Sequence, residues 1–242
     1  MIALALTACG SSGGNDAAGA PEGPNSAEGL WSGSTNTSRS VTGIVLDDGT
    51  YWILYAVPHA SSLIGGVVQG TGTALNGSFS STDGIDFNVE GQGITSATVS
   101  ASYMVRQSLN GSVTYPGLNQ AYTFTSSYNS DYDQTPSASA IAGTYTGVAS
   151  VSSSNELTTI VISSLGVVAG TGTGGCKFVG SAQPRAKGNL YDVSVVFGGG
   201  VCPGGASAVY GIGYLDASAK RLYLAALNKS RSDGLIFTGF KP

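Results

Sequence analysis

The sequence predicts an all-β protein made of two related antiparallel β-barrel units in tandem, the second an eight-stranded meander. Three observations lead to this prediction. Apolar and polar residues alternate with period two, Asn-Gly and Asp-Gly pairs are frequent, and short stretches recur in the same order in both halves of the chain. The chain has 242 residues, 41% of them hydrophobic, and a net charge of only −4, a composition typical of a folded chain rather than a disordered one.

The alternating segments are the predicted strands. Residues 97–105, 191–197 and 208–214 alternate as expected of strands with one buried face. In the second half we predict strands near residues 143–150, 157–163, 166–173, 176–182, 189–197, 206–214, 221–227 and 234–240. Eight short antiparallel strands favour a small closed barrel, because closure removes exposed sheet edges; an open sandwich is the alternative.

Several dipeptides are typical of the two-residue type I′ turns that join antiparallel strands. Such turns need positive φ angles, which Asn, Asp and Gly adopt most readily. The predicted turns are Asp48-Gly49, Asn76-Gly77, Asp83-Gly84, Asn110-Gly111 and Asp233-Gly234. We interpret the acidic stretch Asp83-Gly84-Ile85-Asp86 as a turn as well.

The two halves of the chain echo each other at three places. Residues 29–33 (GLWSG) correspond to 143–147 (GTYTG), residues 67–73 (VVQGTGT) to 167–173 (VVAGTGT), and, more loosely, 122–125 to 235–238. The order of the echoes predicts two related β units. The predicted divisions are a signal peptide remnant at 1–8, a lipidated Cys with a flexible Gly/Ser/Ala tether at 9–28, a first β unit at 29–126, a linker at 127–140 and a second β-barrel unit with a disulfide at 141–242.

The N-terminus carries a motif with a known chemistry. An apolar run, residues 1–6, leads into Leu6-Thr7-Ala8-Cys9 and then a Gly/Ser-rich stretch. This order resembles the lipobox of bacterial lipoproteins, which implies that Cys9 is lipidated and becomes the first mature residue. Gly10 after it is compatible with sorting to the outer membrane. The run is too short to span a bilayer and lacks a basic n-region, so we expect the true start of the signal peptide to lie upstream.

The cysteine count fits this assignment. The chain has three cysteines. With Cys9 lipidated, Cys176 and Cys202 remain, and an exported protein allows them to form a disulfide. The alternatives are two buried free thiols or a metal pair, although a metal site would need two more soft ligands and the single histidine is distant in sequence.

Catalytic and phosphate-binding motifs are weak. His59 is the lone histidine, and without a Gly-x-Ser-x-Gly elbow we expect it to be a loop or strand-end residue rather than a catalytic base. The Gly-Thr-Gly stretches at 70–72 and 170–172 lack the helix and lysine that follow phosphate loops, so we interpret them as strand residues. We therefore predict no enzyme, no cofactor and no catalytic residue.

One acidic cluster lies in the predicted linker. Asp131 and Asp133, with Asn129 and Ser130, are rich in oxygen ligands. The pattern departs from an EF-hand loop, which needs Gly at the sixth position and Glu at the twelfth. We interpret this stretch as a solvated linker and predict no metal site.

Aromatic residues concentrate in the first unit and the linker. Exposed rings would form a binding surface, but we expect most of them to fill barrel interiors or ends, and the ligand-binding residues stay unknown. The residues are Trp31, Tyr51, Trp52, Tyr55, Tyr103, Tyr115, Tyr122, Tyr128 and Tyr132.

Composition excludes several functions. Charged residues make up 10% of the chain, with 10 Lys and Arg in all, so there is no electrostatic footprint for nucleic acid. No run after residue 10 approaches the ~18 apolar residues of a membrane-spanning helix.

In plan, the chain resembles surface lipoproteins of Gram-negative bacteria such as factor H-binding protein and the lobes of transferrin-binding protein B, which combine a lipidated Cys, a Gly-rich tether and eight-stranded barrels. The resemblance implies no particular ligand.

Two functions remain open at this level. The first is a binding module anchored at the cell outer membrane, on its periplasmic side or at the cell surface, with a protein or a small molecule as ligand. The alternative is a structural or assembly lipoprotein of the envelope with a protein partner. An open barrel mouth lined by aromatic residues would favour ligand binding, whereas a plugged one would favour protein recognition by loops.

Overall fold

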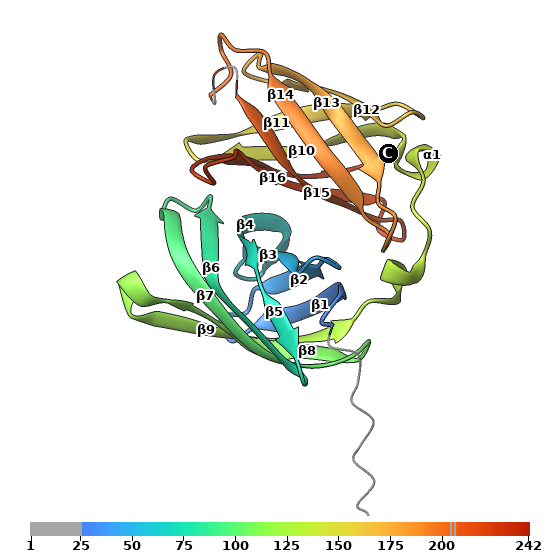
Figure 1. Ribbon diagram of the computed structural model, residues 1–242. Helices are drawn as coiled ribbons and strands as arrows, with labels where there is room; N and C mark the ends of the chain where they lie inside the picture. The colour runs from blue at the N-terminus through green and yellow to red at the C-terminus, as the bar shows by residue number, and fades with distance from the viewer. Residues whose placement is uncertain (1–25, 204, 206) are drawn as a thin grey trace, which may run out of the picture.

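The chain folds into two closed antiparallel β-barrels. The computed structural model describes residues 26–203, 205 and 207–242, and Figure 1 shows the two barrels stacked, with a connecting segment along one side. The predicted fold class is therefore confirmed. The predicted lipobox and most of the tether lie outside the described residues.

The first barrel contains eight strands and one short side strand. Its strands are β1 (Gly29–Thr35), β2 (Ser40–Val45), β3 (Thr50–Val57), β4 (Ala60–Thr71), β6 (Ser78–Asn88), β7 (Gly93–Met104), β8 (Ser108–Tyr115) and β9 (Gln120–Tyr128). Pairing of β1 with β9 and of β4 with β6 closes the ring. The side strand β5 (Thr73–Leu75) pairs with β6 alone, and a short 3-10 helix, η1 (Pro116–Leu118), precedes β9.

The second barrel is an uninterrupted meander. Its strands are β10 (Gly143–Val151), β11 (Ser154–Ile162), β12 (Val167–Gly172), β13 (Lys177–Pro184), β14 (Tyr191–Phe197), β15 (Ala208–Asp216), β16 (Arg221–Leu227) and β17 (Gly234–Phe240). Each strand pairs with the next, and β17 pairs with β10. All eight predicted strands are present, and the ring is closed rather than an open sandwich.

The turn predictions were right where the chain reverses locally. Asn76 and Gly77 have φ angles of 49° and 78°, as a type I′ turn requires. Asp48-Gly49 also forms a turn before β3, but only Gly49 has a positive φ, 84°, so this turn is not of type I′. The prediction for Asn110-Gly111 was wrong, because both residues lie within β8. The reversal from β7 to β8 is made instead by residues 105–107, with Arg106 at a φ of 54°.

Two further turn predictions were also wrong. Asp83 and Gly84 lie inside β6, at an irregularity in its pairing with β7, and Asp86 continues the same strand. Asp83 is held there because its Oδ1 accepts hydrogen bonds from the Thr71 backbone N–H at 2.8 Å and from the Ser81 hydroxyl at 2.9 Å. The pair Asp233-Gly234 ends a longer loop in which Arg231 has a φ of 56°.

The segment between the barrels is ordered rather than merely solvated. It contains a 3-10 helix, η2 (Ser130–Asp133), and one turn of α-helix, α1 (Ala138–Ile141). Tyr132 and Ile141 are buried. The Tyr214 hydroxyl donates to Asp131 Oδ2 at 3.0 Å, so an acidic side chain of the linker binds the second barrel.

The barrels pack against each other through an apolar interface. The outer faces of β1–β4 contribute buried Leu, Ile, Val and Trp side chains, which form one cluster with residues of β15–β17. Two arginines of the second barrel also donate hydrogen bonds to backbone carbonyl oxygens of the first barrel. Arg221 of β16 donates to the carbonyl oxygens of Ser61 and Ser62 in β4, at 3.1 and 2.7 Å. Near the other end of β4, Arg231 donates to the Gln69 carbonyl oxygen at 2.6 Å.

Candidate functional site

One end of the first barrel is an open cavity of about 320 Å³, which we call the cup. The other end of this barrel is filled by buried rings, among them Trp31, Tyr51 and Phe79. The mouth of the cup is formed by the β1–β2, β3–β4 and β6–β7 connections and by η1. The cup is lined by Thr35, Thr37, Arg39, Val41, Ile53, Tyr55, Pro58, Val68, Asp86, Asn88, Gln92, Thr95, Val113, Tyr115, Leu118, Gln120, Tyr122 and Phe124.

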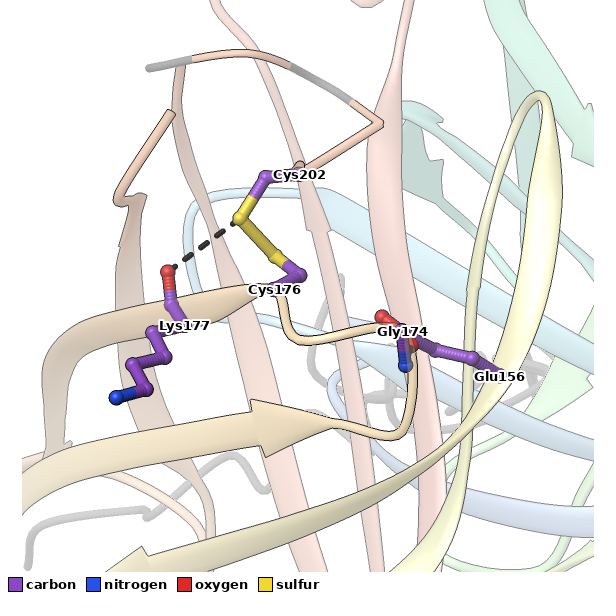
Figure 2. Close-up of a disulfide and its surroundings, with 5 residues drawn as sticks. All are labelled: Glu156, Gly174, Cys176, Lys177 and Cys202. Carbon is purple, nitrogen blue, oxygen red and sulfur yellow. Dashed lines mark hydrogen bonds between the residues drawn. A yellow bond between two sulfur atoms is a disulfide. The ribbon is translucent and has the colours of Figure 1, made fainter. Parts of the chain in front are cut away.

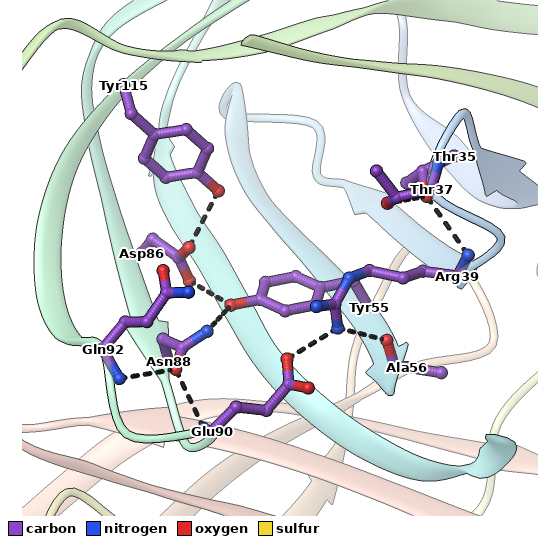
Figure 3. A network of polar contacts seen from close by, with 10 residues as sticks. All are labelled: Thr35, Thr37, Arg39, Tyr55, Ala56, Asp86, Asn88, Glu90, Gln92 and Tyr115. Atoms are coloured by element: carbon purple, nitrogen blue, oxygen red, sulfur yellow. Dashed lines mark hydrogen bonds and ion pairs between the residues drawn. The ribbon is translucent and has the colours of Figure 1, made fainter. Parts of the chain in front are cut away.

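A buried carboxylate lies in the wall of the cup. Asp86 of β6 is 5% exposed, and both of its oxygens accept hydrogen bonds from tyrosines of other strands. The Tyr55 hydroxyl donates to Oδ1 and the Tyr115 hydroxyl to Oδ2, each at 2.8 Å. The Asn88 amide in turn donates to the Tyr55 oxygen at 3.0 Å, as Figure 3 shows. Three strands therefore converge on one polar group in the wall of the cup.

The protonation of this group is unusual for an aspartate. Burial raises the pKa of Asp86 to about 6, and the hydrogen bonds from Tyr115 and Tyr55 and the charge of Arg39 offset only part of that rise. Burial and the nearby carboxylate also raise the pKa of both tyrosines, which therefore remain neutral donors. Asp86 is therefore mostly ionised at neutral pH and becomes protonated as the pH falls below about 6.

An ion pair lies at the mouth of the cup. Arg39 Nη1 is 2.6 Å from Glu90 Oε2, and the same nitrogen donates to the Ala56 carbonyl oxygen at 2.9 Å. The guanidinium carbon of Arg39 lies 5.4 Å from the centre of the Tyr55 ring. The Asn88 side chain accepts the Glu90 backbone N–H at 2.9 Å, which positions the acidic partner (Figure 3). Because Arg39 and Glu90 neutralise each other, Asp86 sets the charge of the cup.

The interior of the second barrel is filled by side chains. Its core cluster includes Tyr145, Phe178 and Phe197, and the last two rings pack edge to face with centroids 5.7 Å apart. A disulfide joins Cys176, just before β13, to Cys202 in the β14–β15 loop, with the two Cα atoms 4.5 Å apart (Figure 2). The predicted disulfide is therefore present, and the alternatives of free thiols or a metal pair do not hold.

The other predicted site residues have structural roles. His59 is exposed in the turn between β3 and β4, with a φ of 60°, and its backbone N–H donates to the Ser38 carbonyl oxygen at 3.1 Å. Asp133 accepts a hydrogen bond from Tyr128 and pairs with Arg106. Within the described ranges, no cluster of three or more His, Cys, Asp or Glu side chains could hold a metal ion. The two Gly-Thr-Gly stretches belong to β4 and β12, as expected, with Gly72 just past the end of β4.

Residue Cys9 lies outside the described residues, so its lipidation stays a prediction. The end of the predicted tether is described, and it packs on the body. Ala27 is buried, and Glu28 accepts a hydrogen bond from the Tyr132 hydroxyl at 2.9 Å. Across the part of the chain that the structure covers, no helix is both long and apolar enough to span a bilayer.

Eight of the nine predicted aromatic residues divide into three groups, and the ninth, Tyr128, is partly buried against both the core of the first barrel and the contact between barrels. Trp31, Tyr51 and Tyr103 fill the closed part of the first barrel, as expected of plugging rings. Trp52 and Tyr132 lie in the contact between barrels. The third group, which sequence reasoning did not assign to a site, lines the cup and consists of Tyr55, Tyr115 and Tyr122.

The fold and the cup define a class of protein: a tandem β-barrel protein in which one barrel is filled and the other holds a ligand-sized cavity.

No protein-family model matches the chain, and no curated protein matches it. Two solved structures show limited similarity. A candidate outer membrane protein of Bacteroides fragilis is 16% identical over 88% of this chain and 96% of its own, with a TM-score of 0.27. Isotype 1 transferrin-binding protein B of serogroup B Neisseria meningitidis is 8% identical over 85% of this chain and 66% of its own, with a TM-score of 0.30. At these scores neither likeness supports a statement about the present chain.

Proposed function

We propose that this chain is a binding protein of the cell envelope, anchored by a lipid on Cys9, that takes a small ligand into the cup of its first barrel. The observation that carries the proposal is the contrast between the two barrels. The second is filled by side chains, whereas the first retains about 320 Å³ of open space at one end. Tight packing is the rule in protein interiors, so an open barrel end of this size needs an explanation.

The lining of the cup fits this function. Known ligand pockets have volumes of about 300–1,000 Å³, mostly apolar walls and a few polar groups that orient the ligand. The cup combines apolar residues such as Val41, Val68 and Val113 with the group formed by Asp86 and its two tyrosines. Its walls are strands of a closed barrel, so the site is formed before the ligand arrives.

Binding in the cup is tested with a neutral apolar fluorophore, N-phenyl-1-naphthylamine, and the full 242-residue chain. We expect saturable binding at one site. Thr95→Trp places an indole at the lining of the cup and should weaken binding at least ~10-fold. Thr171→Trp adds the same ring at an exposed position of β12 and should leave binding unchanged. Absence of saturable binding, or equal binding by the Thr95→Trp variant, would refute the proposal.

The membrane anchor has its own test. Cells that express the chain behind a complete signal peptide are labelled with an alkyne fatty acid. We expect the label on the wild-type protein and its loss, with release from the membrane fraction, in Cys9→Ser. Equal labelling of the variant would exclude Cys9 as the acceptor. Protease treatment of intact cells then separates display at the cell surface from a periplasmic location.

A second candidate function, a structural or assembly role with a protein partner, is favoured by one observation. Val161, Ala169, Val179 and Val196 are exposed and lie in register across β11–β14, forming an apolar row on the outside of the second barrel. Exposed contiguous apolar surface is typical of protein contacts. In this case Val179→Lys should abolish crosslinking of the second barrel to an envelope protein in intact cells, whereas Thr171→Lys should not.

A further inference from the structure

Asp86 is a buried carboxylate without a cationic partner in direct contact. Its two hydrogen bonds come from neutral tyrosine hydroxyls, and no lysine or arginine among the described residues forms an ion pair with it. A carboxylate offers about four lone-pair sites, so acceptor capacity remains after two bonds. Buried charges in proteins are normally paired, because an unpaired ion loses hydration without compensation.

The groups around Asp86 do not supply the missing charge. Arg39, from the β1–β2 connection, acts on Asp86 only at longer range and is paired with Glu90 of the β6–β7 connection, itself acidic. Tyr55 of β3 and Tyr115 of β8 are neutral donors. With one cation and two carboxylates facing this end of the barrel, the cup has a net negative charge when Asp86 is ionised.

Aromatic rings line the same cup as the carboxylate. Tyr55, Tyr115, Tyr122 and Phe124 all line the cup, and the rings of Tyr115 and Tyr122 meet edge to face with centroids 5.9 Å apart. The faces of aromatic rings carry negative partial charge and attract cations, most strongly where water is excluded. Apolar wall residues such as Val41, Val68 and Val113 also line the cup and favour a hydrophobic body on the ligand.

We propose that the cup binds a small organic ammonium ion with an apolar or aromatic body, and that Asp86 is its counter-charge. This inference rests on the binding function proposed above and names the ligand class. The ammonium group would donate to the free lone pairs of Asp86, while the ligand body occupies the apolar part of the cup. Such a ligand neutralises the charge of Asp86, which no cationic side chain of the described residues pairs directly.

Two other ligand classes fit less well. A hard metal ion such as Ca²⁺ or Mg²⁺ takes about six or more oxygen ligands, and the cup offers one carboxylate in place of a cluster. An anion would face the carboxylate of Asp86 and would have to displace Glu90 from Arg39.

The test compares phenethylamine with 2-phenylethanol, which has the same body but a neutral hydroxyl. Binding to the full chain is measured at pH 7.5 by calorimetry. We expect the amine to bind at least ~10-fold more tightly than the alcohol, because only the amine pairs with the buried charge. Asp86→Asn should remove this preference, whereas Asp48→Asn, the same change in an exposed turn, should keep it.

A measurement on the wild-type protein makes the test independent of any variant's folding. As pH falls from 7.5 to 5, Asp86 gains a proton, so the affinity for phenethylamine should drop while that for 2-phenylethanol stays constant. Equal affinities for the two compounds, or an amine preference that survives both Asp86→Asn and acidification, would overturn the inference.

The outcomes also separate this inference from the function on which it rests. If N-phenyl-1-naphthylamine binds and Thr95→Trp blocks it, but the amine shows no preference, the cup binds ligands and the ammonium assignment is wrong. If neither the dye nor the amine binds in a way that Thr95→Trp affects, the binding function itself is wrong, and the ligand class is refuted with it.

Discussion

Trp31 and Tyr145 occupy the same position in the two barrels. Each lies on the first strand of its barrel, each is fully buried, and each donates a hydrogen bond to the carbonyl oxygen four residues earlier. The Trp31 indole N–H reaches Ala27 at 3.1 Å, and the Tyr145 hydroxyl reaches Ile141 at 2.8 Å. The two barrels therefore begin with the same plug, which is the physical basis of the GLWSG and GTYTG echo in the sequence.

The glycines that end these two motifs also share a role, and they give the first prediction. A Cβ built on Gly147 would overlap the Thr238 carbonyl oxygen, and one on Gly33 would overlap the Thr125 carbonyl oxygen, at the pairing of first and last strands. We expect Gly147→Ala to lower the free energy of unfolding by about 1–3 kcal/mol, because the closing strands must separate. Urea unfolding measures this change.

The control for this prediction is Gly117→Ala. A Cβ at Gly117 meets no atom within 4 Å. Its effect should be within ~0.5 kcal/mol of zero, as for other surface substitutions. If Gly147→Ala also left the free energy of unfolding unchanged, the close approach of β10 and β17 would not be the reason for glycine at this position.

The sequence predicted the fold well because its main signals are local. Alternation located every strand of the second barrel, and the echoes at 29–33 and 122–125 lie in the first and last strands of the first barrel, like their counterparts in the second. The echo at 67–73 is different. It lies mainly in the fourth strand of the first barrel, whereas 167–173 covers the third strand of the second. That likeness reflects strand composition, so it does not mark equivalent positions.

Turns were harder to predict, because tertiary contacts override local preference. Gly111 pairs with Ala101 within the sheet, and glycine is needed there because a Cβ would come within 2.5 Å of the Ala101 Cβ on β7. Asn110 lies beside it because its Oδ1 accepts the Ser126 backbone N–H at 2.9 Å. Both constraints come from neighbouring strands, so a dipeptide rule cannot detect them.

The cup could not be predicted from the sequence for a related reason. Asp86 meets Tyr55 and Tyr115 at sequence separations of 31 and 29, and only closure of the barrel brings them together. One local signal was available. Asp86 and Asn88 alternate with Ile85 and Phe87, which places two polar residues on one face of a strand, and both are buried. A polar pair at inward positions of a barrel strand is a useful marker for a site.

The second prediction concerns the contact between barrels. Arg221 is buried and bridges β16 to the Ser61 and Ser62 carbonyl oxygens of β4. We expect Arg221→Met to lower the free energy of unfolding by about 2–3 kcal/mol, since it keeps an apolar stem but removes the hydrogen bonds to both carbonyl oxygens and to the buried Thr238 hydroxyl. Proteolysis within residues 129–142 should also become faster. Lys229→Met, at an exposed loop position, should change neither quantity. An unchanged urea midpoint for Arg221→Met would contradict this role.

The third prediction concerns the disulfide. Cys176 and Cys202 are separated by 26 positions, and closing a loop of this length restricts the unfolded chain by about 3–4 kcal/mol in the chain-entropy model. The double change of Cys176→Ser and Cys202→Ser should lower the free energy of unfolding by that amount. Reduction of the wild-type protein should have the same effect. Cys9→Ser should have none, and equal unfolding of oxidised and reduced wild-type protein would refute the prediction.

The fourth prediction is a pH dependence of stability that Asp86 controls. Its pKa rises from an ordinary 3.8 to about 6 on folding, because burial disfavours the charged form. Between these values the folded protein binds more protons than the unfolded chain, so stability falls as pH rises through this window. A shift of two units corresponds to about 3 kcal/mol.

This contribution is isolated by subtracting the free energy of unfolding of Asp86→Asn from that of the wild-type protein at each pH. Asparagine does not titrate, and other groups cancel in the difference. We expect the difference to move in favour of the wild type by up to about 3 kcal/mol as pH falls from 7 to 4. The same subtraction with Asp48→Asn should lack this rise, because Asp48 is exposed. A flat difference for Asp86→Asn would mean that burial in the cup does not disfavour the charged form of this carboxyl.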